Sequence, residues 1–123
     1  MIKSLLRGLT RNHARLEPSA DDPALRPPAL ASAPADVADE IQSWVASQPR
    51  WRLVSRRDDA ETVELHLTRT TRVFRFTDDI QVNLSARGDH QTLVNAQSRS
   101  RVGKGDLGQN RRNLKELLAV LSF

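Results

Sequence analysis

The segment from Ser98 to Arg112 carries most of the side chains in this sequence that could bind an anion. Arginines and a lysine flank a glycine-rich stretch there, just before a helical pattern begins. The first backbone amides of a helix are unpaired and favour negative charge, and guanidinium groups bind phosphate or carboxylate through two hydrogen bonds. We therefore expect a basic Gly/Arg turn (98–112) that presents the following ligand-binding residues: Arg99, Arg101, Gly103, Lys104, Gly108, Asn110 and Arg111.

Gly103, Gly105 and Gly108 also form the pattern G-x-G-x-x-G, which joins a strand to a helix in dinucleotide-binding proteins. That fold needs a second parallel strand and an acidic residue about 20 residues further on. The sequence after Gly108 offers neither, and Lys104 is not followed by Ser or Thr as in a Walker motif. We expect no nucleotide cofactor. The structural alternative for this stretch is a tight turn in which the glycines supply positive φ and Asp106 caps the helix.

Asp78 and Asp79 form a carboxylate pair that could serve acid–base chemistry together with Arg101, as in a small hydrolase-like enzyme. Adjacent residues of a strand point to opposite faces, so the two acids share a substrate only if the chain turns there. The role we favour is ionic, with one acid accepting hydrogen bonds from an arginine of the segment Ser98–Gly103. We predict no catalytic residues and leave the enzyme reading as an alternative.

Other chemistries have little support in the composition. The sequence has no cysteine, and its three histidines (His13, His66 and His90) lack the spacing of metal ligands. His66 is expected on the solvated face of a strand. Aromatic residues make up 4% of the chain and include no tyrosine, which disfavours a base-stacking surface and sequence-specific nucleic-acid binding. We expect no metal and no cofactor.

Alternating apolar and polar residues predict the strands that must position these side chains. Val63, Leu65 and Leu67 alternate with polar residues, and a second alternation runs from Phe74 to Leu84, with a bend expected at Thr77–Asp79. Trp51–Arg56 and Thr92–Arg101 read as two further strands. On the last of these, Ser98 and Ser100 share a face of small residues that is suited to close packing under a helix.

Two amphipathic helices flank the strands. The first has apolar residues on one face from Val37 to Val45, Ser32 or Asp36 as its N-cap, and an end at Pro49. The second follows Asp106 and buries a stripe from Asn110 to Leu121. This order predicts an α+β fold with an antiparallel sheet of about four strands and both helices on one face. The predicted core is Val37, Ile41, Trp44, Val45, Val63, Leu65, Leu67, Phe74, Phe76, Ile80, Val82, Val94, Leu114, Leu117, Leu118 and Leu121.

Two motifs resemble those of a family of small bacterial and plant proteins known only as a domain of unknown function. The first is the F-x-D-D segment at Phe76, and the second is S-x-S-R-x-G-x-x-D-x-G-x-N, which begins at Ser98. The resemblance covers residues 36–121 approximately and implies a fold and a surface rather than a reaction. It marks as a structural motif the residues Asp78, Asp79, Ser98, Ser100 and Asp106, and it also includes Phe76, Arg101, Gly103, Gly108 and Asn110.

The N-terminal third differs in composition from the rest. Residues 1–16 carry four basic groups and no acidic group, and their apolar and basic residues follow a helical spacing. This pattern is consistent with a basic amphipathic tail that contacts a membrane peripherally or docks on the domain. Residues 17–34 hold five of the six prolines and read as a linker or a strap. We place a single α+β domain at 35–123 and expect residues 1–34 to be dispensable for folding. No signal peptide or transmembrane segment is recognisable, which favours the cytoplasm.

The favoured function is a non-catalytic domain that binds an anionic small molecule or protein surface. The formal net charge of +4 supports an anionic partner, and twelve of the fourteen basic groups after residue 48 are arginine. A structural subunit is the remaining alternative.

Overall fold

A computed structural model describes residues 13–72, 75–101 and 108–121 of the chain. The elements follow in the order β1 (His13–Arg15), η1 (Pro23–Leu25), β2 (Ala29–Leu30), α2 (Pro34–Ala46), β3 (Trp51–Asp58), β4 (Thr62–Thr70), β5 (Thr77–Ala86), β6 (Thr92–Ser100) and α3 (Gln109–Ala119). The strands form one sheet of six in the order β1-β6-β5-β4-β3, with β2 also paired to β6, and every pairing is antiparallel. The predicted α+β class with an antiparallel sheet is confirmed, and the sheet has six strands where about four were expected.

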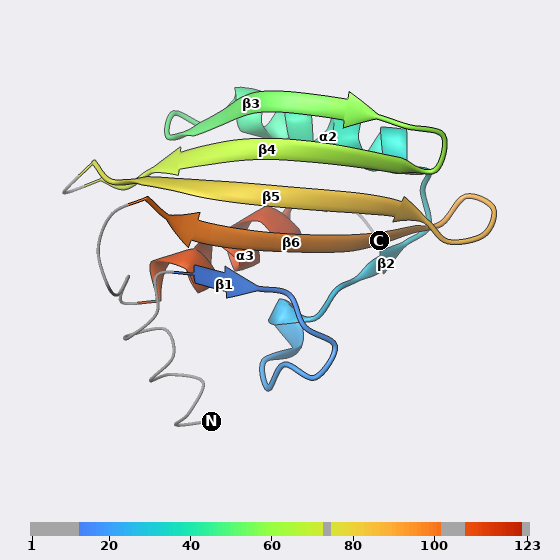
Figure 1. Ribbon diagram of the computed structural model, residues 1–123, viewed down its shortest axis with the longest axis horizontal. Helices are drawn as coiled ribbons and strands as arrows, with labels where there is room; N and C mark the ends of the chain where they lie inside the picture. Colours follow the sequence, from blue (N-terminus) through green and yellow to red (C-terminus); the bar gives the residue numbers. More distant parts are fainter. Residues whose placement is uncertain (1–12, 73–74, 102–107, 122–123) are drawn as a thin grey trace.

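Figure 1 shows α2 and α3 behind the sheet, so that one face of the sheet is covered and the other is open. The covered face is built from the alternation in β4, β5 and β6, and its buried apolar residues there are Val63, Leu65, Leu67, Ile80, Val82, Leu84, Val94 and Ala96. Helix α2 packs on β3, β4 and β5, and α3 packs on β6 and β1. The open face therefore carries the alternate residues of these strands, most of which are polar.

Both helices begin at residues other than those predicted. Helix α2 has Ala33 as its N-cap and Pro34 in its first turn, where the missing N–H of proline costs no helical hydrogen bond. Helix α3 has Gly108 as its N-cap, with φ of +82°. Ser32 or Asp36 as a cap of α2 is therefore wrong. The expected cap Asp106 lies outside the described residues, and α3 starts after Gly108.

The predicted core is largely confirmed, with exceptions near β5. Phe76 exposes 42% of its surface, because it precedes β5 and follows Arg75, whose positive φ of +54° interrupts the extended backbone. The expected bend at Thr77–Asp79 is wrong, since these residues are the first of a continuous strand. Trp44 is partly buried and lies against Trp51, with ring centroids 4.8 Å apart. Phe74 lies outside the described residues.

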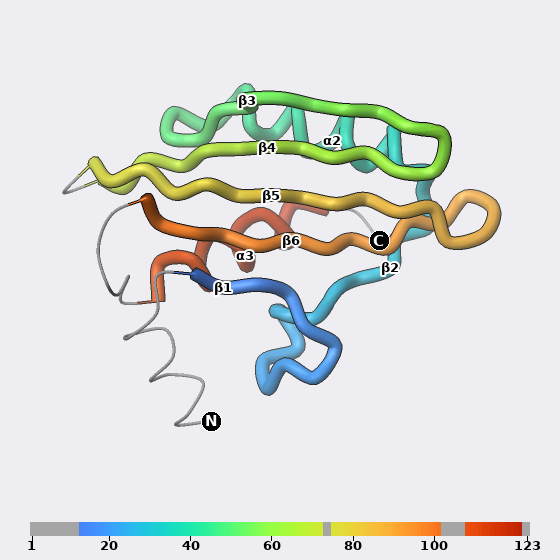
Figure 2. Tube along the Cα trace, viewed as in Figure 1, coloured from blue at the N-terminus to red at the C-terminus, as the bar shows by residue number. Residues whose placement is uncertain are grey.

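The Pro-rich segment is a strap that belongs to the core. Leu16, Leu25 and Leu30 are at most 4% exposed and join the hydrophobic cluster. Figure 2 shows β1 beside one end of β6 and β2 at its other end, with η1 between them. Such burial argues against the expectation that these residues are dispensable for folding. Residues 13–15 are a strand rather than part of the helix expected over 1–16, and residues 1–12 lie outside the described residues.

Candidate functional site

Asp79 forms an ionic cluster with Arg101 and His66 on the open face of the sheet. The Arg101 guanidinium donates from Nε to Oδ2 at 2.8 Å and from Nη2 to Oδ1 at 2.9 Å, and His66 Nε2 lies 2.8 Å from Oδ1. The hydrogen bonds from Arg101, with a smaller contribution from His66, lower the pKa of Asp79 from 3.8 to about 2. The predicted contact between one of the two acids and an arginine of the segment Ser98–Gly103 is thus confirmed, and His66 is partly buried in a hydrogen bond with Asp79 rather than simply solvated.

Asp78 points to the opposite face. It is 1% exposed and accepts a hydrogen bond from Asn113 Nδ2 of α3 at 2.8 Å. The alternation of β5 therefore separates the two carboxylates by the thickness of the sheet. They cannot share a proton of one substrate, so the hydrolase-like pair of Asp78 and Asp79 is wrong in its geometry.

A buried polar network fastens α3 to β6. Ser98 Oγ donates to Asn110 Oδ1 at 2.6 Å, and Asn110 Nδ2 donates to Ser100 Oγ at 2.9 Å. Asn113 Nδ2 also donates to Ser98 Oγ at 3.1 Å. All four of these residues are buried, as expected for a small-residue strand face under a helix. The two serines and Asn110 therefore fix the helix, and Asn110 cannot contact a ligand at the surface as predicted.

Arg69 of β4 contacts the edge of this network. Its Nη1 donates to Asn113 Oδ1 at 3.0 Å, and its Nη2 lies 3.3 Å from Glu116 Oε2. The guanidinium also lies 5.9 Å from the centre of the Trp51 ring, whose Nε1 donates to Glu116 at 3.3 Å. Three elements, β3, β4 and α3, thus meet at one arginine, which points to a structural role.

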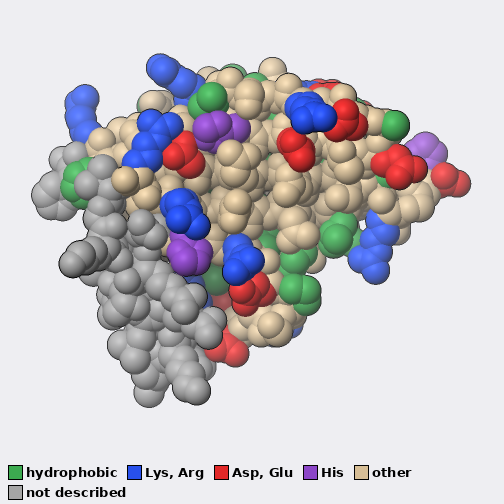
Figure 3. All heavy atoms as spheres, viewed as in Figure 1, with side chains coloured by type: hydrophobic (Ala, Val, Ile, Leu, Met, Phe, Trp, Pro, Cys, Tyr) green, Lys and Arg blue, Asp and Glu red, His purple; other side chains and the backbone are tan. Residues whose placement is uncertain are grey.

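Further cations lie on the open face beside the Asp79 cluster. In the pairing of β1 with β6, His13 lies opposite Arg99 and Arg15 lies opposite Gln97. Arg99 points to the open face, because its neighbours Ser98 and Ser100 point to the helices. It forms no ion pair with an acid in the part of the chain that the structure describes, while Arg15 has a 3.5 Å contact with Glu17. Figure 3 shows basic and histidine side chains gathered at this end of the open face.

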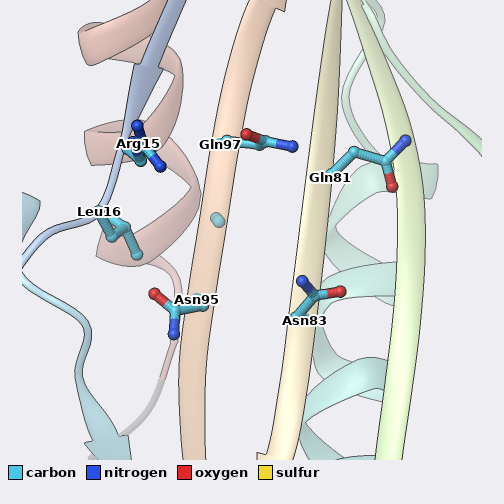
Figure 4. Close-up of a pocket in the computed structure, with 7 residues that line it drawn as sticks. Arg15, Leu16, Gln81, Asn83, Asn95 and Gln97 are labelled. Carbon is cyan, nitrogen blue, oxygen red and sulfur yellow. The ribbon is translucent and has the colours of Figure 1, made fainter.

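A shallow hollow of about 180 Å³ lies next to these cations, on strands β1, β5 and β6. Cross-strand partners Gln81 and Gln97 form one row of carboxamides, and Asn83 and Asn95 form the next. In Figure 4, Gln97 reaches from β6 toward β5, while Asn95 reaches toward the strap. The labelled lining residues are Arg15, Leu16, Gln81, Asn83, Asn95 and Gln97.

The predicted Gly/Arg turn is divided by the fold. Arg99 and Arg101 lie on the open face, whereas Arg111 belongs to α3 behind the sheet. The pKa of Asp22 in the strap is lowered mainly by a hydrogen bond from Lys115, and the charge of Arg111 contributes to the same shift. Gly108 is the positive-φ start of α3. Gly103, Lys104 and Asp106 lie outside the described residues. The structure therefore does not bring all the predicted ligand-binding residues to one place.

Several residues of these clusters escaped the sequence analysis. Asn113 follows Asn110 at helical spacing and borders Leu114, so its position on the buried stripe could have been predicted from the sequence. Arg69 and the carboxamide rows had no comparable signal, because a polar residue on a strand face is most often solvated. His13 and Arg15 were misplaced because the tail was read as helical.

Wider searches of the molecule add two findings. Over the described ranges, no group of three or more His, Cys, Asp or Glu side chains could hold a metal ion. No described helix combines the length and hydropathy needed to cross a membrane.

Comparison with known proteins assigns a family and no activity. The model of the family described as "Protein of unknown function (DUF1499)" matches residues 9–121, which confirms the resemblance seen in the two motifs. The match also includes the whole of the strap, in agreement with its burial. A search of curated proteins finds no match.

Proposed function

Because this chain belongs to DUF1499, a family of proteins of unknown function, no reaction is inherited from relatives, and we propose that it is a non-catalytic domain that binds an anionic ligand or partner on the open face of its sheet. The observation that carries the proposal is the gathering of His13, Arg15 and Arg99 on that face. These side chains come from two paired strands and are held by the register of the sheet rather than by a loop.

The Asp79 cluster supports a binding role over a catalytic one. A carboxylate with a pKa of about 2 is a weak base, and its two oxygens are already engaged by Arg101 and His66. The neighbouring acid faces the helices. What the cluster does offer is a fixed position for Arg101, whose side chain remains 53% exposed and can contact an anion placed beside Arg99.

Four predictions from the sequence remain part of this proposal. Gly103 and Lys104 remain predicted ligand-binding residues. Peripheral membrane contact through residues 1–16 and a cytoplasmic location are also retained, as is the alternative that the domain serves as a structural subunit. Cell fractionation of a tagged full-length chain would test the location.

The binding role is tested with citrate as a small trivalent probe. In a titration followed by ¹H–¹⁵N NMR, we expect the largest shifts at His13, Arg15 and Arg99, and weaker binding as salt rises. The double variant Arg15→Gln/Arg99→Gln should bind citrate at least fivefold more weakly, since each lost charge-assisted contact is worth about one order of magnitude or less at an exposed site.

The matched control is Arg57→Gln, which removes an exposed arginine of the same sheet that lies on β3. Its affinity for citrate should equal that of the unmodified chain. Equal weakening in both variants, or shifts spread evenly over all arginines, would show that citrate responds to net charge alone and would refute the proposed site.

A further inference from the structure

The carboxamide rows of the open face indicate what kind of anion fits there. Gln81, Asn83, Asn95 and Gln97 are all exposed, and none of them hydrogen-bonds to another described side chain. Each carboxamide offers two N–H donors and an acceptor oxygen. The hollow therefore presents closely spaced, uncharged hydrogen-bond donors and acceptors that are available to solvent or to a ligand.

The spacing of these groups follows from the sheet. Alternate residues of a strand lie about 7 Å apart, and directly paired residues of neighbouring strands have Cβ atoms about 5 Å apart. The Cβ atoms of these four residues on β5 and β6 thus lie near the corners of a small rectangle, because Gln81 pairs with Gln97 and Asn83 pairs with Asn95, while the ends of the side chains point in different directions. A rectangle of this size matches one six-membered ring rather than an extended chain.

Charge is supplied at the margin of the rectangle. Arg15 lines the hollow directly and is the cross-strand partner of Gln97, and Arg99 follows Gln97 two residues along the same face of β6. An arginine beside neutral carboxamides suits a ligand with one anionic group and several hydroxyls.

We propose that the hollow between β1, β5 and β6 binds a polyhydroxylated cyclic anion, the chemistry of a hexuronic acid or a sugar phosphate. The carboxamides hold the hydroxyls, since a hydroxyl both donates and accepts as a carboxamide does, and Arg15 with Arg99 holds the carboxylate or phosphate. This inference rests on the proposed function, because it names the ligand class of the same basic face. The hollow is shallow, so we expect dissociation constants on the order of 1 mM.

The test is a ¹H–¹⁵N NMR titration that follows the side-chain NH₂ signals of asparagine and glutamine. D-Glucuronate is compared with cyclohexanecarboxylate, which has a similar ring and charge without hydroxyls, and D-glucose 6-phosphate is compared with inorganic phosphate. We expect at least one sugar anion to bind about fivefold or more tightly than its counterpart, with shifts at the NH₂ groups of Asn83 and Gln97. The sugar anion that binds more tightly identifies whether the anionic group of the ligand is a carboxylate or a phosphate.

The matched variants are Asn83→Ala/Gln97→Ala and, as control, Ser85→Ala, which lies on the same face of β5 outside the hollow. The double variant removes two exposed side chains, so it should keep its melting temperature while losing about tenfold in affinity for the sugar anion. The control should keep both.

The remaining outcomes separate the two proposals. If cyclohexanecarboxylate and phosphate bind at Arg15 and Arg99 as tightly as the sugar anions, the hydroxyl inference is overturned and the anion-binding function stands. If D-glucose binds as tightly as D-glucuronate, or an acidic peptide binds more tightly than both, the ligand class is wrong. If no anion shifts Arg15 or Arg99, the proposed function fails, and this inference fails with it.

Discussion

Replacement of Asp79 with asparagine tests whether the ionic cluster stabilises the sheet. The variant Asp79→Asn keeps the shape of the side chain and removes the charge that Arg101 and His66 contact. Since Arg101 follows the last residue of β6 and His66 lies on β4, the cluster spans three neighbouring strands. We therefore expect a loss of stability at neutral pH.

The magnitude follows from the pKa. A shift from 3.8 to about 2 corresponds to about 2.5 kcal/mol at 1.36 kcal/mol per pKa unit. Arg101 exposes 53% of its side chain, and solvent screening reduces the value for such a pair to about 1 kcal/mol. A double-mutant cycle with Arg101→Gln should give a coupling energy of similar size.

The effect must depend on pH with a defined sign. The pKa of Asp79 is lower in the folded chain than in the unfolded chain, so the stabilisation is fully present above pH 3.8 and is lost as the pH falls toward 2. Urea unfolding at pH 7 and at pH 3 measures this directly. The difference between Asp79→Asn and the unmodified chain should shrink by roughly half at the lower pH.

Asp59→Asn serves as the control, since its carboxylate makes a 3.5 Å contact with Arg57 in which both side chains are more than half exposed. It should change the free energy of unfolding by less than about 0.5 kcal/mol. A loss for Asp79→Asn that is the same at both pH values, or a coupling to Arg101 below about 0.3 kcal/mol, would refute the ionic account.

Four further changes probe the parts of the fold that hold this face. Asn113→Ala removes a hydrogen bond to the buried carboxylate of Asp78 and should cost about 2–4 kcal/mol in urea unfolding. Leu25→Ala should lower the free energy of unfolding by about 2–4 kcal/mol, because Leu25 belongs to the hydrophobic core. For the same reason, deletion of residues 1–34 should abolish the cooperative thermal transition. A truncated chain that still melts cooperatively would show otherwise. Gly108→Ala should cost about 1–2 kcal/mol by thermal melting, since φ is +82° and the new Cβ would lie 3.4 Å from Arg112 Nη1. An unchanged melting temperature would contradict the assignment of Gly108 as the N-cap of α3.

The regular part of the fold was predictable because its burial is periodic. Val63 to Leu67 and Ile80 to Leu84 alternate cleanly, and this period-two signal also placed Ser98 and Ser100 under a helix. The same logic failed at Phe76, which lies outside β5 and follows Arg75 at positive φ, so its parity carried no information about its exposure.

The strap was undervalued for a different reason. Leu16, Leu25 and Leu30 are separated by prolines and acids, so no period of two or 3.6 connects them. Each is buried by an independent contact with the sheet or α3, which a single sequence does not reveal. The candidate site depended on the same contacts, since the register of β1 brings Arg15 beside Gln97.

The pairing of the strap has a consequence for the order in which this protein folds. Residues 13–30 find their partners in β6 and α3, as in the hydrogen bond from Leu16 N to Ala96 O and the ion pair between Asp22 and Lys115. The segment that leaves the ribosome early must therefore wait until the last strand and helix have been synthesised. Contacts over such sequence separations close slowly, because a long loop must be ordered before any of them forms. We expect β3, β4 and β5 to associate first and the anion-binding face to be completed in the last step of folding, when β1 docks on β6.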